Sequence, residues 1–302
     1  MDFQKRQKQL TRYLLKTTDT LEWKEQELIE RLEITSAEWE KIVTGRRYVL
    51  IDEFCRLAES LEVNLDDFYN EKLSLSELKR RMTVGPDHFL PEKYMLAQQS
   101  RMRTSASLLD FIGLRHGPLA RQRILRKLQV SEAMVENREQ MVNMGFFIDI
   151  CDTVKSYGCS DDFLVEMGGF SSTSNRNSSF AREFEKLSGP KEVYESLVDT
   201  LGVHFEKNHQ YSIGKLTSSL CDIRSRPNPA VLEALKAKKL GSKNSCLARQ
   251  GVATSFALYH GHRNVVVEET KCIHRGDPEC VYRVKWAPLP VEKFHSGLSF
   301  IN

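Results

Sequence analysis

Long apolar segments are missing from this 302-residue sequence, which has no run near the ~20 residues that a membrane-spanning helix needs. Its first ten residues, MDFQKRQKQL, also lack the apolar core of a secretory signal peptide. These absences predict a cytoplasmic protein that does not associate with membranes.

Common enzyme motifs are missing as well. The sequence contains no G-x-x-x-x-G-K-[ST] phosphate loop, no G-x-S-x-G and no G-x-G-x-x-G. Neither a nucleophile–base pair nor a redox-cofactor motif stands out. We therefore expect a protein that is not an enzyme.

A disulfide framework is not indicated. The seven cysteines are odd in number and widely scattered, at positions 55, 151, 159, 221, 246, 272 and 280. In a chain without an export signal, this usage favours reduced thiols or a metal site.

The composition is that of a globular protein, with 40% hydrophobic and 28% charged residues, and the length suggests about two domains. The formal net charge of +3 hides a division along the chain. Residues 1–80 hold 14 Lys+Arg and 17 Asp+Glu, a balance of −3, so residues 81–302 hold the remaining 30 and 24, a balance of +6.

The first 71 residues carry apolar stripes at helical spacing and no strand pattern. Thr35 and Glu38 fit a capping box at the start of one helix, and Gly45 is a natural stop for that helix. A short helix followed by a tight turn and a second helix predicts a helix-turn-helix arrangement.

Later in the chain the spacing of apolar residues changes from a helical to an alternating pattern. Partial apolar–polar alternation in 209–225, and β-rich segments at 263–270 and 281–286, predict antiparallel strands. The predicted fold class is α+β. It comprises an all-α helix-turn-helix domain (1–71), a helical linker (72–116), an α/β sensor domain with an antiparallel sheet (117–286) and a tail (287–302).

Two segments of the N-terminal region, LEWKEQELIERLEITSAEWEKIVTGRR and LAESLEVNLDDFY, resemble the Cro/phage-repressor class of helix-turn-helix over roughly residues 8–71. The resemblance implies a helix in the major groove of double-stranded DNA and basic residues near phosphates. The implied DNA-binding residues are Ser36, Ala37, Glu40, Lys41, Thr44, Arg46 and Arg47.

The charges of this region leave a second interpretation open. Glu38 and Glu40 put two carboxylates on the helix that would read bases, and the region is acidic overall. Because DNA affinity depends largely on neutralising phosphates, the alternative is an inherited fold now used for dimerisation or partner binding.

Three late cysteines, Cys246, Cys272 and Cys280, occur together with Glu269. Thiolates and a carboxylate are suitable zinc ligands, although this spacing is not that of common zinc modules and buried free cysteines are frequent. Residues 204–286, above all Glu269 to Tyr282, resemble the 4-vinyl-reductase domain of aromatic-responsive bacterial activators. That resemblance implies structural zinc held by these four residues, with no position open for water.

Aromatic residues in the same region are candidates for the wall of a ligand pocket, with ordinary core packing as the alternative explanation. They are Phe205, Tyr211, Phe256 and Tyr259. Together the two resemblances imply a one-component bacterial transcription regulator, a homodimer whose DNA binding is controlled by a small hydrophobic effector. The alternative is a signalling or interaction adaptor that does not bind DNA.

Overall fold

The computed structural model describes residues 3–262 and 264–287. The chain divides into two compact units, Met1–Thr153 and Val154–Asn302. From residue 288 on, the predicted tail lies outside the described residues. No helix in the described ranges has the length and apolar character needed to span a bilayer.

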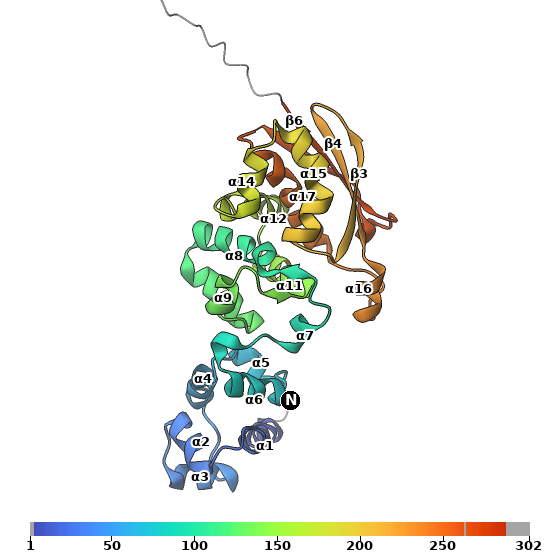
Figure 1. Ribbon diagram of the computed structural model, residues 1–302. Helices are drawn as coiled ribbons and strands as arrows, with labels where there is room; N and C mark the ends of the chain where they lie inside the picture. The colour runs from blue at the N-terminus through green and yellow to red at the C-terminus, as the bar shows by residue number, and fades with distance from the viewer. Residues whose placement is uncertain (1–2, 263, 288–302) are drawn as a thin grey trace, which may run out of the picture. The chain divides into compact units, whose positions relative to one another are not determined.

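The first unit is almost entirely helical, which agrees with the predicted helical N-terminal region (Figure 1). Residues 72–116, predicted as a linker, contain three of its helices. Its elements are α1 (Phe3–Leu21), α2 (Glu25–Leu32), α3 (Ser36–Val43), α4 (Ile51–Ser60), α5 (Leu65–Tyr69), α6 (Leu75–Val84), η1 (Pro86–His88), α7 (Glu92–Met95), β1 (Ser100–Arg101), α8 (Met102–His116), α9 (Pro118–Leu128), α10 (Glu132–Glu136), β2 (Met141–Val142) and α11 (Met144–Ser156), which runs into the second unit.

The start of α3 has the predicted cap. The Thr35 hydroxyl accepts the Glu38 amide at 3.2 Å, and Glu38 Oε2 accepts the Thr35 amide at 2.8 Å. These bonds satisfy orphan backbone donors at the helix start. Behind the cap, Trp39 and Ile42 of α3 are buried in the same core as Leu28 of α2, as the apolar stripes predict.

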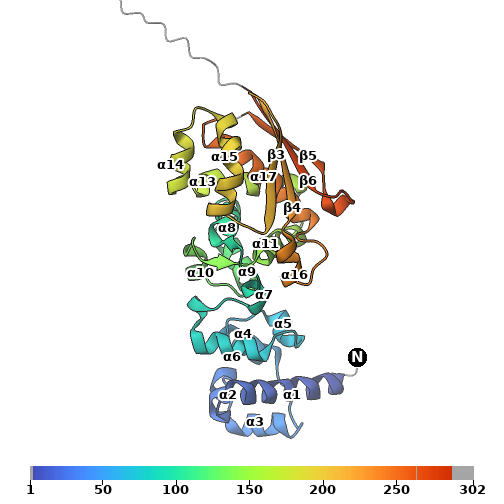
Figure 2. The ribbon, with the colours of Figure 1, turned by 45° about the vertical axis from the view of Figure 1, so that its right-hand side comes forward.

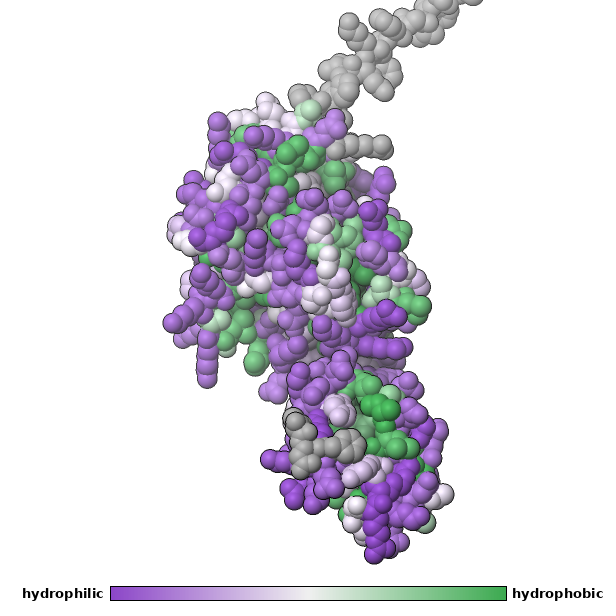
Figure 3. Space-filling model, turned by 180° about the vertical axis from the view of Figure 1, so that it is seen from behind, coloured by the Kyte–Doolittle hydropathy of each residue, from purple (hydrophilic) through white to green (hydrophobic). Residues whose placement is uncertain are grey.

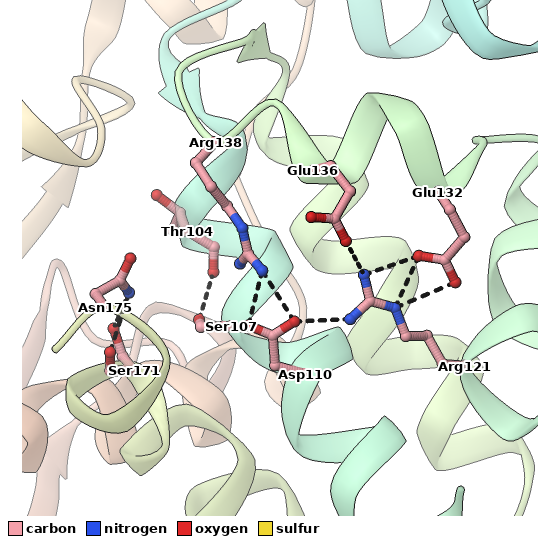
Figure 4. Close-up of polar contacts among 9 residues, drawn as sticks. All are labelled: Thr104, Ser107, Asp110, Arg121, Glu132, Glu136, Arg138, Ser171 and Asn175. Atoms are coloured by element: carbon pink, nitrogen blue, oxygen red, sulfur yellow. Dashed lines mark hydrogen bonds and ion pairs between the residues drawn. The ribbon is translucent and has the colours of Figure 1, made fainter. Parts of the chain in front are cut away.

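A half-buried carboxylate ties together three parts of the second half of this unit (Figure 4). Asp110 of α8 accepts hydrogen bonds from Arg121 of α9 at 2.7 Å and from Arg138, after α10, at 2.9 Å. Arg121 also donates to Glu132 of α10 at 3.0 Å. Such charge-assisted bonds fix the angle between neighbouring helices more firmly than apolar contact alone.

The second unit combines helices with one antiparallel sheet. Its elements are α12 (Asp161–Gly169), α13 (Ser171–Ser174), α14 (Ser179–Glu185), α15 (Pro190–His204), β3 (His209–Leu216), β4 (Leu220–Pro227), α16 (Pro229–Ala234), α17 (Lys243–Leu258), β5 (Val265–Lys271), η2 (Ile273–Arg275) and β6 (Cys280–Trp286). The α+β class is therefore confirmed.

The four strands pair in the order β3-β4-β6-β5, all antiparallel. Helices α15 and α17 cover one face of this sheet (Figures 1 and 2). Between the helices and the sheet lies one core, which includes Leu197 of α15, Phe256 of α17, Ile223 of β4 and Val284 of β6. Side chains along a strand point alternately to its two faces, and one stripe of each helix is apolar, so both kinds of element direct their apolar residues into this layer.

Outside the core the surface is largely hydrophilic, with separate groups of hydrophobic side chains (Figure 3). Among the large apolar residues most exposed in the first unit are Leu50 and Ile51, at 54% and 58%. Such exposure is common in globular proteins and by itself identifies no partner.

Helices α12 and α17 meet backbone to backbone. A Cβ atom added at Gly168 would overlap the carbonyl oxygen of Ala248, and one added at Gly251 would overlap the carbonyl oxygen of Val165. Only glycine permits so close an approach. The two glycines therefore fix the distance between these helices and the rotation of α17.

Gly251→Ala should lower the free energy of unfolding of the second unit by about 1–3 kcal/mol or more, because the new methyl group must push α12 away. Gly202→Ala in α15 is the matched control, since nothing lies within 4 Å of its added Cβ. That control should stabilise by about 0.5–1 kcal/mol through better helix propensity. Thermal unfolding of the full chain compares the two, and equal midpoints would contradict the close approach.

Candidate functional site

The structure brings the four predicted metal ligands together, although they lie up to 34 positions apart in the sequence. The ligand atoms of Cys246, Glu269, Cys272 and Cys280 all lie within 4.8 Å of one another. Cys246 belongs to the first turn of α17, Glu269 to β5 and Cys280 to the start of β6, while Cys272 follows β5. The three thiols are at most 2% exposed.

Local structure positions each of these side chains. Ser242 caps α17 and bonds reciprocally with Ser245, which fixes the helix start next to Cys246. After β5 the chain turns through η2 and reaches Gly276, whose φ of 100° suits glycine. Asp277 accepts the Cys272 amide at 2.8 Å. The turn thereby returns the chain to β6 with Cys272 and Cys280 on the same side.

The cluster has the dimensions of a site for one ion. Sγ of Cys246 and Sγ of Cys280 are 3.9 Å apart. Two thiolates bound tetrahedrally at about 2.3 Å from one ion would lie about 3.8 Å apart. Glu269 Oε2 accepts a hydrogen bond from Arg275 at 2.9 Å, but Oε1 is buried and has no hydrogen-bond partner among the described residues. A buried carboxylate oxygen without a partner is costly unless something positive satisfies it.

The thiols are electrostatically coupled. The hydrogen bond between the Cys246 and Cys280 thiols lowers the pKa of Cys280 below its ordinary value and raises the pKa of Cys246. Burial raises the pKa of Cys246 further. Burial also raises the pKa of Cys272. The cluster therefore readily loses one proton, from the Cys246–Cys280 pair, and further deprotonation needs a nearby positive charge.

A second polar cluster is buried beside the sheet. Glu206, His209 and Arg249 are each at most 6% exposed. Nδ1 of His209 lies 3.2 Å from Glu206 Oε1, and Nη1 of Arg249 lies 2.6 Å from His209 Nε2. The Tyr211 hydroxyl and the Asn208 amide also donate to Glu206.

Arg249 contacts both ring nitrogens of His209, because its Nη2 also lies 3.0 Å from Nδ1, the nitrogen that faces Glu206. Burial, followed by the charge of Arg249, lowers the pKa of His209, which agrees with a neutral ring. Burial alone would raise the pKa of Glu206, but His209, Arg249 and Tyr211 together lower it to about 2. The cluster is thus a carboxylate and a guanidinium joined through imidazole.

An apolar cavity lies next to this cluster, between α15, α17 and the sheet. Of the four residues predicted as pocket wall, Tyr211 and Phe256 line it. Phe205 is packed in the core, and Tyr259 lies beside a separate surface hollow with Ser172 and Arg176. Arg249 and Tyr282 also line the cavity.

Sequence reasoning missed Glu206, Arg249 and Tyr282. Arg249 did carry a signal, because after Lys243 it is the only charged residue in α17. A lone charge within a buried helix needs a partner. Nothing in the sequence indicated that this partner would be Glu206, which follows α15.

The predicted DNA-binding residues lie on and after α3. Ser36, Ala37, Glu40, Lys41, Thr44 and Arg46 are exposed. Arg47 is not available in the way predicted, because it forms ion pairs with Glu53, which is 2% exposed, and with Glu38 at 3.9 Å. A guanidinium held by a buried carboxylate is a weak candidate for a phosphate contact.

Comparison with known proteins gives structural likeness only. No family model matches the chain, and no curated protein is similar to it in sequence. A solved Fe(II) unliganded H-NOX protein from K. algicida is 10% identical, with a TM-score of 0.45, covering 63% of this chain and 97% of its own. An H-NOX protein from S. oneidensis in the Fe(II)NO state is 12% identical, with a TM-score of 0.47, covering 62% and 99%.

These comparisons overturn the family assignment made from the sequence. The matched structures are H-NOX proteins, not Cro-like or 4-vinyl-reductase proteins. The prediction of a transcription regulator with ligand-controlled DNA binding is therefore wrong, and the ion pairs of Arg47 give a physical reason on the DNA side. The alternative of a signalling or interaction adaptor stays a prediction. Nothing in these comparisons supports the prediction of structural zinc either: the matched structures are described in Fe(II) states.

Glu206 should make the second unit acid-sensitive. Its pKa is about 2 in the folded chain against an ordinary 4.5, so its stabilisation is present above about pH 4.5 and is lost as the pH falls towards 2. Glu206→Gln should cost on the order of 3 kcal/mol at pH 7 and flatten the loss of stability between pH 5 and 3.

Urea unfolding at several pH values measures both effects. The matched control is Glu195→Gln, on α15, whose side chain is 49% exposed and pairs with Lys191 at 3.4 Å. It should change the stability by less than about 1 kcal/mol. If both variants unfold alike at every pH, the buried charge of Glu206 does not stabilise the fold.

Proposed function

We propose that the second unit binds one thiophilic metal ion through Cys246, Glu269, Cys272 and Cys280. The observation that carries this proposal is the convergence of three buried thiols and one carboxylate, from three elements, within 4.8 Å. The unpartnered Oε1 of Glu269 supports it independently.

The ligand types narrow the class of ion. Soft thiolates favour ions such as those of the later first-row transition metals and disfavour Ca²⁺ and Mg²⁺, which require oxygen ligands. Four protein ligands complete a tetrahedral shell and leave no position for a reacting water. Such an ion would hold the fold together or report its own availability.

The ion would join parts of the chain that are otherwise linked only by packing. It would tie the start of α17 to both strands of the β5–β6 hairpin. Three thiolates and a carboxylate exceed the charge of a divalent ion, and Arg275 is placed to offset the excess through its bond to Glu269. Binding would then contribute directly to folding stability, as in other closed sites.

Cobalt(II) provides a direct test, because thiolate ligation gives it intense charge-transfer absorption. The full chain, stripped with a chelator under reducing conditions, should bind one equivalent and show thiolate-to-cobalt bands. At a free ion concentration 100 times Kd, its free energy of unfolding should rise by about 2.7 kcal/mol.

Cys272→Ala should abolish the bands and the stabilisation. Cys221→Ala is the matched control, because Cys221 is also 0% exposed in the same core but lies outside the cluster. That variant should retain one equivalent of cobalt(II) with the same spectrum. Absence of thiolate bands in the unsubstituted protein, or equal spectra for both variants, would refute the metal site.

A further inference from the structure

A groove on the surface of the first unit runs between α1 on one side and α3 with the turn after it on the other (Figure 2). Its volume is about 590 Å³, which is within the range of ordinary binding pockets. The α1 wall has the i, i+3, i+4 spacing of one helix face. Its lining residues are Gln4, Gln7, Lys8, Thr11, Arg12 and Leu15, and the opposite wall consists of residues 42–45, 47 and 48.

Both walls of the groove expose apolar side chains. Leu15 is 37% exposed, and across the groove Val43 and Tyr48 are 46% and 40% exposed. Ile42 lines the groove between them and is buried in the core. Apolar side chains that converge in a hollow, rather than lie scattered over a surface, are typical of an area that a partner covers.

The charged residues of the groove all have the same sign. Lys8, Arg12 and Arg47 line it, and none of the described lining residues is acidic. Arg47 is held by Glu53, whereas Lys8 and Arg12 are exposed and form no ion pair with a described residue. Helix α1 as a whole carries five basic residues and one acidic residue. The positive charge of an acidic region is thus concentrated on the helix that forms one wall.

This combination decides between two classes of partner. The phosphates of a nucleic acid would pair with Lys8 and Arg12, but they would leave the exposed parts of Leu15 and Val43 without apolar contact, and the exposed carboxylate of Glu40 on α3 would repel them. An amphipathic helix with apolar residues on one face and carboxylates beside them satisfies both kinds of group in the groove.

We propose that the groove between α1 and α3 is a docking site for an acidic amphipathic helix of a protein partner. The apolar side chains of that helix pack on Leu15, Val43 and Tyr48, and its carboxylates pair with Lys8 and Arg12. The site lies in the first unit and uses none of the four metal ligands, so the inference is independent of the proposed metal site.

Three fluorescent peptides of about 16 residues, with one common helical pattern, test the class of partner. The acidic amphipathic peptide has leucine on one face and glutamate on the other, the neutral peptide has glutamine in place of glutamate, and the alanine peptide has alanine in place of leucine. Anisotropy titrations with the full chain should give the acidic amphipathic peptide a Kd on the order of 10 μM. The other two peptides should bind at least about tenfold more weakly.

Lys8→Glu combined with Arg12→Glu should weaken binding of the acidic amphipathic peptide at least about tenfold, because two attractions become repulsions. Lys24→Glu combined with Lys72→Glu is the matched control, since it changes the net charge equally at exposed positions outside the groove. The control should bind within about threefold of the unsubstituted protein. Both double variants should keep the melting temperature, because all four side chains are exposed.

Val43→Ser should weaken the same binding about three- to tenfold through the loss of apolar area that the peptide covers. Val84→Ser is its matched control. The two valines are the last residues of α3 and α6 and are 46% and 43% exposed, but Val84 does not line the groove. Val84→Ser should bind within about twofold of the unsubstituted protein.

Each other outcome overturns the proposal. Equal binding of the neutral peptide or the alanine peptide would show that the groove does not select an acidic amphipathic helix. Tighter binding of a DNA duplex of random sequence would show that its basic residues serve phosphates. No detectable binding of the acidic amphipathic peptide, or undiminished binding by the Lys8 and Arg12 double variant, would show that the groove is not its docking site.

Discussion

The close approach of α12 and α17 at Gly168 and Gly251 is the constraint on which both buried polar clusters of the second unit depend. With backbone against backbone, α17 can neither rotate nor move away from α12. Arg249 lies about half a turn around the helix from Gly251, so it must face the sheet layer rather than α12. The position of the glycines thereby determines where Cys246, Arg249 and Phe256 point.

Placing a guanidinium in that layer has consequences beyond α17. A buried cation must be matched, and the match is Glu206, reached through neutral His209 on β3. The hydrogen bonds that keep the pKa of Glu206 near 2 also tie the end of α15 to the sheet. Nε of Arg249 and the hydroxyl of Tyr282 have no hydrogen-bond partner among the described residues, and both residues contribute to the lining of the small apolar cavity.

Several features could be predicted from the sequence because their physics is local. The capping box of Thr35 and Glu38 involves four consecutive residues, and the strands near 265–271 and 280–286 follow from side-chain alternation. The four metal-ligand candidates came from residue type together with the resemblance to the 4-vinyl-reductase domain, and the fold shows that they lie within reach of one ion. The family and functional assignments were wrong. On the DNA-binding side, Arg47 looks like a phosphate-binding residue until its pairing with Glu53 is known.

The sequence by itself therefore determined the helices, the strands, their caps and the chemical types available for a site, since these depend on neighbours a few residues apart. Only the tertiary structure decided which groups meet. Arg249 and His209 are 40 positions apart, and Cys246 and Cys280 are 34 apart, yet each pair is in contact. Desolvation by the whole fold then determines which charges must be paired, and no local pattern contains that information.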